Sequence, residues 1–145
     1  MRRIARELRP ETLDDLGLQS ALRALATNAA AHQGLSVQRE LDAGDMKLRP
    51  EVELVVYRVA QESLTNVMRH AEASEVLLAL QRVDGALRLI VRDNGRGLPD
   101  DAGAGAGMTG MSERALHVGG RLVVASSPET GTEVRLDIPL PEARE

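Results

Sequence analysis

The chain has 145 residues, enough for one domain with a single core but too few for two full domains. Its 43% hydrophobic and 28% charged residues indicate a folded protein, and the lack of cysteine excludes disulfides, thiolate metal sites and a cysteine nucleophile. A net charge of −4 and a single aromatic residue, Tyr57, argue against nucleic acid as a partner. The longest apolar run, Val76 to Leu80, is far too short to span a membrane, so we expect a cytoplasmic domain without direct membrane contact.

The N-terminal third of the chain is predicted to be mainly helical. Residues 3–8 have a helical period, which should end before Pro10 because proline disfavours the helical conformation of its predecessor. A second helix is expected from Asp14 or Asp15, either of which could cap it, to about His32.

The middle of the chain is predicted to contain one strand, then a long helix, then two further strands. Residues 35–41 alternate apolar and polar residues, as a half-buried strand does. A helix is expected over residues 50–71, with a proline in its first turn where proline is tolerated. Residues 75–82 and 86–92 also alternate, and they flank Asp84-Gly85, a strong signal for a two-residue hairpin.

The last third begins with a glycine-rich loop over residues 93–110, which is too long for a passive connection in a small domain. A short helix over residues 109–118 and strands over 121–126 and 132–139 are expected to follow it. This order of elements predicts an α+β, two-layer sandwich with helices packed on one face of a mixed, mainly antiparallel sheet.

Three polar residues of the long helix are the first candidate site. Glu62, Asn66 and His70 are four residues apart and therefore lie on one stripe of the helix surface. The same stripe begins with three apolar residues: Val52, Val55 and Val59. Because the stripe begins with core residues, we expect its polar residues to face a cavity between the helix and the sheet. The alternative is that they lie on an exposed end of the helix.

The second candidate site follows the hairpin, where the sequence is Asp93-Asn94-Gly95-Arg96-Gly97. An ionised carboxylate is only an acceptor, which suits an exocyclic amine such as that of adenine, and Gly95 and Gly97 would let the backbone approach a ligand. The alternative is an ordinary turn, because Asp, Asn and Gly are common in turns.

The third candidate is the glycine series ahead of the expected helix at residue 109, in which Gly105, Gly107 and Gly110 follow Gly103. Such a segment can direct backbone amides and a helix N-terminus at phosphates. It also fits the dinucleotide pattern G-x-G-x-x-G, but that pattern requires a strand leading directly into the first glycine. The alternative is a flexible linker.

Together and in this order, the motifs resemble the ATP-binding domain of sensor histidine kinases, of the nitrate-sensor type, in the superfamily of gyrase, Hsp90 and MutL ATPases. The similarity lies in YRVAQESLTNVMRHA (the N box), VRDNGRGL (the G1 box), GAGAGMTGMSERALHVGGRLVV (the G2 box) and TGTEVRLDIPL. LRPETLDDLGLQSAL is similar to the segment that joins the dimerisation helices to this domain. The fold implied is the Bergerat-type ATP-binding fold, with ATP and Mg²⁺ as cofactors.

The resemblance also implies roles for single residues. Asn66 would bind Mg²⁺ through its amide oxygen, and Asp93, supported by Thr132, would bind the adenine amine. Glu62 would orient water or help to deprotonate the acceptor. The other residues implied to surround the nucleotide lie on the phosphate side or in the pocket and lid: Arg69, His70, Gly95, Gly97, Gly105, Gly107 and Gly110.

Function and partners follow from the same resemblance. Residues 1–16 are expected to be a remnant of the dimerisation-helix region and its linker, and residues 17–145 the catalytic domain. The segment IARELRP has Arg9 and Pro10 where the family's acceptor motif has its histidine and the residue after it, so we interpret Arg9 as a linker residue.

The γ-phosphoryl group of ATP would then pass to a histidine on a dimerisation bundle outside this chain, and next to the receiver domain of a response regulator. The full-length protein would be a homodimer, and any membrane anchor would lie outside this chain. The alternatives are a nucleotide-sensing module without transfer activity and an anti-sigma-factor-type serine kinase. The linker segment favours the histidine kinase.

Overall fold

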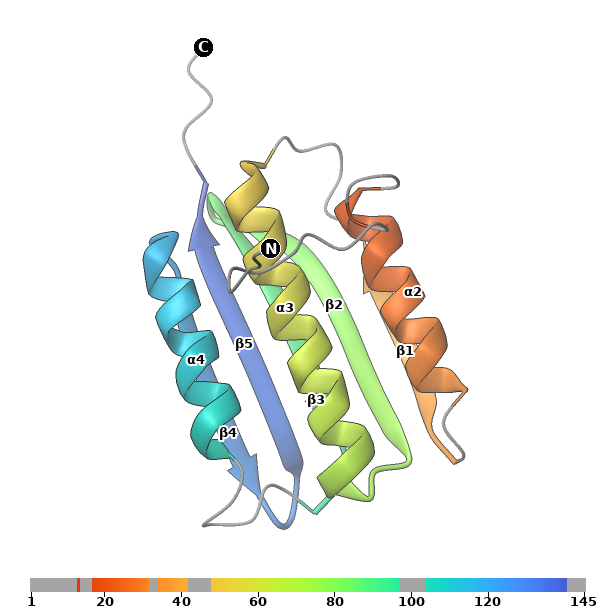
Figure 1. The fold of residues 1–145 in the computed structure, drawn as a ribbon. Coiled ribbons are helices and arrows are strands. Elements are labelled where there is room, and N and C mark those ends of the chain that lie inside the picture. Colours follow the sequence, from red (N-terminus) through yellow and green to blue (C-terminus); the bar gives the residue numbers. More distant parts are fainter. Residues whose placement is uncertain (1–12, 14–16, 32–33, 42–47, 97–103, 141–145) are drawn as a thin grey trace, which may run out of the picture.

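The computed structural model describes residues 13, 17–31, 34–41, 48–96 and 104–140, and for residues 70, 71 and 104–109 the backbone alone. Within these ranges, helices lie side by side on one face of a five-stranded sheet (Figure 1). The strand order is β1-β2-β3-β5-β4, in which β1 and β2 are parallel and all other neighbours are antiparallel. The predicted two-layer α+β sandwich with a mixed, mainly antiparallel sheet is therefore confirmed.

The helical layer consists of α2 (Leu18–Ala30), α3 (Pro50–Asn66) with its continuation η1 (Val67–Ala71), and α4 (Ala104–His117). The predicted helix over residues 50–71 is present, but its last five residues form a π-helix rather than an α-helix. The N-cap of α2 is Gly17, so this helix begins after the expected Asp14 or Asp15, which lie outside the described residues. The helix expected over residues 3–8 also lies outside them.

The strands are β1 (Ser36–Leu41), β2 (Glu75–Val83), β3 (Ala86–Asp93), β4 (Arg121–Ser127) and β5 (Gly131–Pro139), close to the predicted ranges. Between β2 and β3, Asp84 and Gly85 have φ angles of 52° and 78°. Two successive left-handed residues are what a type I′ hairpin turn requires, which explains why Asp-Gly predicted the turn correctly.

Helix α4 begins earlier than the sequence predicted. It starts at Ala104 instead of Thr109, so Gly105, Gly107 and Gly110 lie inside the helix and not in a loop before it. Alanine is the best helix former, and Ala104 and Ala106 beside these glycines partly offset the preference of glycine for other conformations. Burial of Met111 and Ala115 holds the helix against the rest of the domain, so tertiary packing outweighs the local propensity.

The core lies between the two layers and is aliphatic apart from Tyr57, which is 8% exposed. Alternate residues of the strands point into it, and their neighbours point to the opposite face of the sheet. Each fully buried leucine, isoleucine or valine contributes about 1.5–3 kcal/mol relative to an exposed one. The largest fully buried side chains are Leu13, Leu22, Leu64, Leu78, Leu80, Leu87, Leu89, Leu136, Ile138, Val56, Val59 and Val91.

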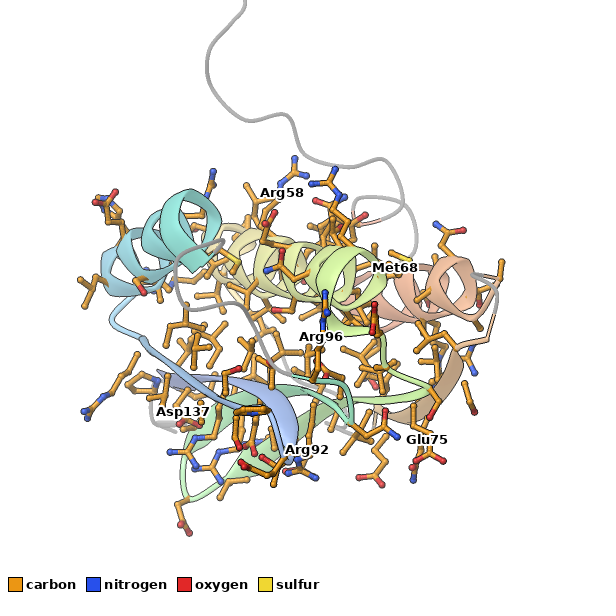
Figure 2. The ribbon with its side chains drawn as sticks, turned by 90° about the horizontal axis from the view of Figure 1, so that it is seen from below. Arg58, Met68, Glu75, Arg92, Arg96 and Asp137 are labelled. Carbon is orange, nitrogen blue, oxygen red and sulfur yellow. The ribbon has the colours of Figure 1, made fainter. Side chains whose placement is uncertain are left out.

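The other face of the sheet has no helix on it among the described residues and carries charged side chains, such as Arg92 and Asp137 (Figure 2). Arg88 Nε donates to Asp137 Oδ1 at 2.7 Å, and Arg92 Nε to Glu133 Oε1 at 3.4 Å. These pairs link neighbouring strands, and they keep charged groups on the face that solvent covers.

Segments that are distant in the sequence meet at one end of the sheet, where β3 ends and β2 and β5 begin. In the pairing register, Val76 at the start of β2 lies opposite Asp93 at the end of β3, and Arg92 lies opposite Glu133 at the start of β5. Figure 1 shows the end of α3 and η1 at the same end of the sheet.

No helix within the described ranges is long and apolar enough to cross a membrane.

Candidate functional site

Asp93 is the last residue of β3, and its side chain points to the helical side of the sheet with only 4% of the residue exposed. Its Oδ1 accepts hydrogen bonds from the backbone N–H of Gly95 at 2.8 Å and of Thr132 at 3.4 Å. Its Oδ2 has no hydrogen bond to the described part of the chain. The carboxylate is therefore held by one oxygen and can offer the other to a donor such as an amine.

Thr132 lies beside Asp93 on β5 and is also buried, with 7% exposure. Its hydroxyl and that of Ser126 on β4 are 3.0 Å apart, and either can be the donor. The sequence grouped Thr132 with Asp93 through the family resemblance, and the register explains the contact, because the start of β5 pairs with the end of β3. Two adjacent strands thus support one wall around the carboxylate.

The polar stripe of the long helix lies at the same edge of the sheet. Val52, Val55 and Val59 are buried as predicted, whereas Glu62 and Asn66 are half-buried. Arg69 is exposed, and the side chain of His70 lies outside the described residues. The stripe therefore changes from buried to half-exposed as it approaches this end of the sheet.

Asn66 is the last α-helical residue of α3 and immediately precedes the π-helix η1. A π-helix is rare, and single turns of it inside α-helices occur often at functional sites. The segment ends at Glu72, which has a left-handed conformation with a φ of 52°. The sequence did not predict this change of helix type.

The glycines of the candidate site fall into three groups. Gly95 donates its backbone N–H to Asp93 Oδ1 and so forms part of the carboxylate site. Gly97 lies outside the described residues. Gly105, Gly107 and Gly110 lie in the first half of α4, which Figure 1 shows near the start of β5.

A divalent cation would have few preformed ligands here. The described residues contain no group of three His, Asp or Glu side chains that could hold a metal ion. Magnesium is usually bound through one or two protein oxygens together with water and substrate phosphates. An amide oxygen from the half-buried Asn66 fits that donor set, so this residue could hold Mg²⁺ only jointly with a phosphorylated ligand.

A groove of about 300 Å³ also lies at this edge, with Gln38, Glu75, Arg92 and Asn94 among its lining residues. Gln38, Glu75 and Arg92 belong to the face of the sheet without helices, opposite to the side on which the Asp93 side chain is buried. Asp93 also lines the groove, so the groove adjoins the carboxylate site at the end of β3.

Three residues near Asp93 were not selected as site residues from the sequence. Gly131 packs against the backbone of Asp93, Ser126 contacts Thr132, and Asn94 bonds to Ser74 and Glu75. The sequence pattern indicated two of them only by position, since Gly131 directly precedes Thr132 and Asn94 directly follows Asp93. Their partners are far away in the sequence, so the pairing of strands was needed to find the contacts.

Comparison with known proteins agrees with this arrangement. Residues 51–142 match the family described as histidine kinase-, DNA gyrase B-, and HSP90-like ATPase. The chain is 38% identical over 144 residues to the sensor histidine kinase MctS of Rhizobium johnstonii, an alignment that covers 96% of this chain and 31% of that protein. It is 36% identical over 143 residues to the oxygen sensor histidine kinase NreB of Staphylococcus carnosus, with 97% and 41% covered. The chain thus spans less than half the length of these relatives.

Solved structures have the same fold. The histidine kinase domain of the Erythrobacter litoralis blue-light activated histidine kinase superposes with a TM-score of 0.71 at 27% identity, over 85% of this chain and 61% of that one. The ATP binding domain of PrrB from Mycobacterium tuberculosis superposes with a TM-score of 0.64 at 22% identity, over 86% and 95%. The order of motifs, the sandwich and these matches lead to one conclusion: the chain belongs to the histidine kinase-, DNA gyrase B- and HSP90-like ATPase family, as the ATP-binding domain of a sensor histidine kinase.

Proposed function

We propose that this domain binds Mg-ATP and transfers the γ-phosphoryl group to a histidine on a dimerisation and phosphoacceptor bundle outside the chain, as a step of two-component signal transduction. The observation that supports the proposal most is the state of Asp93. This buried carboxylate has one oxygen fixed by two backbone amides and the other without a partner among the described residues. Such an oxygen would accept a hydrogen bond from the adenine amine.

The transfer needs little covalent chemistry from the protein, because phosphoryl transfer depends mainly on positioning and charge neutralisation. A nitrogen of the acceptor imidazole attacks the γ-phosphorus, the bond to the oxygen that bridges the β- and γ-phosphates breaks, and ADP leaves. Mg²⁺, when bound, neutralises charge on the phosphates. Glu62, one helical turn from Asn66, would orient water or take the proton from the imidazole.

The remaining assignments concern the nucleotide surroundings and the partners. Arg69 and His70 would approach the phosphates, and the glycines of α4 would allow that helix to approach the nucleotide. In the full-length protein we propose a homodimer that acts in the cytoplasm and passes the phosphoryl group on to the receiver domain of a response regulator.

The experiment that tests the proposal is binding of a non-hydrolysable ATP analogue, measured by calorimetry with EDTA and with Mg²⁺. The parent should bind more tightly with Mg²⁺, and Asn66→Ala should retain binding but lose most of that enhancement. Thr65→Ala, on the same helix one residue away, is the matched control and should keep it. Equal Mg²⁺ dependence in parent and Asn66→Ala would remove Asn66 from the site, and no binding by the parent would refute the proposed function.

A further inference from the structure

Asp93, the last residue of β3, and Asn94, the residue after it, form hydrogen bonds to different parts of the chain. Asp93 bonds toward the helical side, to Gly95 and Thr132. Asn94 bonds instead to the first residue of β2 and the residue before it: its backbone N–H donates to the Glu75 carbonyl oxygen at 3.2 Å, and its side chain contacts Ser74 and Glu75. The proposed adenine contact and this second anchor are therefore covalent neighbours.

The side chain of Asn94 makes three hydrogen bonds. The backbone N–H groups of Ser74 and Glu75 both donate to Asn94 Oδ1 at 3.0 Å, and Asn94 Nδ2 donates to Ser74 Oγ at 3.0 Å. Only the carbonyl oxygen of an amide can accept from two N–H donors, so the orientation of the amide is determined. Ser74 is itself tied to β1, because its carbonyl oxygen accepts from the backbone N–H of Ser36 at 2.9 Å.

Ser74 lies three residues after the end of the π-helix η1. The intervening residues include Glu72, in its left-handed conformation, and the Glu72 carboxylate lies 3.8 Å from the guanidinium of Arg96. Figure 2 shows Arg96 near the end of the long helix and Glu75 farther along the same edge. The loop after β3 therefore reaches the segment after the helix twice, through Asn94 and through Arg96.

We infer that Asn94 is a positioning residue that holds the end of α3 and η1, with Asn66, at a fixed place relative to Asp93. This inference rests on the proposed function and deepens it, because it explains how the adenine end and the Mg²⁺ end of one site keep their separation. Magnesium demands a nearly ideal octahedral geometry, so its binding depends strongly on the place of Asn66. A hydrogen bond from adenine to Asp93 depends instead on the end of β3 and the start of β5, which together hold the carboxylate.

The test compares parent, Asn94→Ala and Asn94→Asp by calorimetry with adenosine and with a non-hydrolysable ATP analogue, the latter in EDTA and in Mg²⁺. Aspartate keeps an oxygen for the two backbone amides and a second oxygen for the Ser74 hydroxyl, so it is the matched conservative variant. Thermal unfolding of each variant shows whether the fold is retained. Glu75 and Val76 pair with neighbouring strands through their backbones, so we expect this pairing in all three proteins.

In Asn94→Ala, we expect the Mg²⁺ enhancement of analogue binding to fall about three- to tenfold, while adenosine affinity changes less than about twofold. Asn94→Asp should restore most of the enhancement. An equal loss for adenosine and for the Mg²⁺ complex would show a general structural role and overturn the inference, as would an unchanged enhancement in a folded Asn94→Ala protein. Failure of the parent itself to bind the analogue would overturn the proposed function instead, and the inference with it.

Discussion

Gly131 at the start of β5 lies so close to Asp93 that there is no room for a side chain between them. A Cβ atom on Gly131 would overlap the backbone carbonyl oxygen of Asp93 and would lie 2.9 Å from Asp93 Oδ1. Gly131 also has a φ of 93°, which L-residues with a side chain rarely adopt. This close approach allows the neighbouring residue, Thr132, to donate its backbone N–H to the carboxylate.

Gly131→Ala should therefore destabilise the domain more than backbone strain alone would. The matched control is Gly119→Ala, because Gly119 has a φ of 78° but no atom within 4 Å of an added Cβ. The control should lower the free energy of unfolding by about 1–2 kcal/mol, the cost of a left-handed residue. Gly131→Ala should add about 1–3 kcal/mol for the overlap.

Chemical denaturation of the two variants measures this difference, and calorimetry with the ATP analogue should show weaker binding in Gly131→Ala at a temperature where it remains folded. Equal stabilities of the two alanine variants would contradict the close approach of β5 to Asp93.

Asp93→Asn should lower nucleotide affinity without unfolding the domain. The backbone amides of Gly95 and Thr132 require an acceptor, so the amide oxygen of asparagine would face them and its NH₂ group would take the place of Oδ2. That NH₂ group and the adenine amine would then both be donors. The unpaired groups should cost about 1–3 kcal/mol of binding free energy. Unchanged affinity in a folded Asp93→Asn protein, measured by calorimetry, would refute the adenine assignment.

The sequence predicted those parts of the fold that depend on local patterns. Alternation located the strands, Asp84-Gly85 located the hairpin, and the valine stripe of α3 located its buried face. Contacts between distant residues could not be predicted in this way. The parallel pairing of β1 with β2, the bond from Asn94 to Ser74 and the approach of Gly131 to Asp93 all depend on how strands are ordered in the sheet.

The start of α4 shows where local propensity misleads. Glycines at positions 105, 107 and 110 favoured a loop, but the segment is helical from Ala104, where the buried Met111 and Ala115 fix the later turns. Propensity is a weak guide when tertiary packing supports an element. The same glycines nevertheless leave that end of the helix with little intrinsic stability.

The two halves of α4 should therefore differ in the rate of amide hydrogen exchange. Each glycine in a helix costs about 1 kcal/mol relative to alanine, so amides from Gly105 to Gly110 should exchange faster than those from Arg114 to His117. Exchange of the first half should slow when the ATP analogue and Mg²⁺ are added, if this segment closes over the phosphates. We expect residues 98–110 to form the most mobile segment without nucleotide, although residues 98–103 lie outside the described residues. Equal protection along α4 without nucleotide would contradict the prediction.

A final prediction concerns the phosphoryl acceptor. The chain alone should not accumulate phosphohistidine, although it should phosphorylate a separately supplied dimerisation bundle that contains the family's acceptor histidine. The sequence has three histidines, of which His70 belongs to the proposed phosphate end of the site. His117 is exposed near the end of α4 and is followed by Val118, whereas an acidic residue follows the acceptor histidine in the family; His32 also lacks that neighbour.

Transfer to the separate bundle should be slow, because a covalent tether normally provides a high effective concentration of the catalytic domain near its acceptor. The rate of transfer should therefore rise in proportion to the bundle concentration. A slow chemical step would instead give a rate that does not depend on bundle concentration. Incubation with γ-labelled ATP followed by treatment with acid and with base identifies phosphohistidine, since its bond is labile to acid and stable to base. Acid-labile label on the chain alone would show that one of its own histidines is an acceptor. No label on an authentic bundle, with nucleotide binding intact, would favour a nucleotide-sensing module over a kinase.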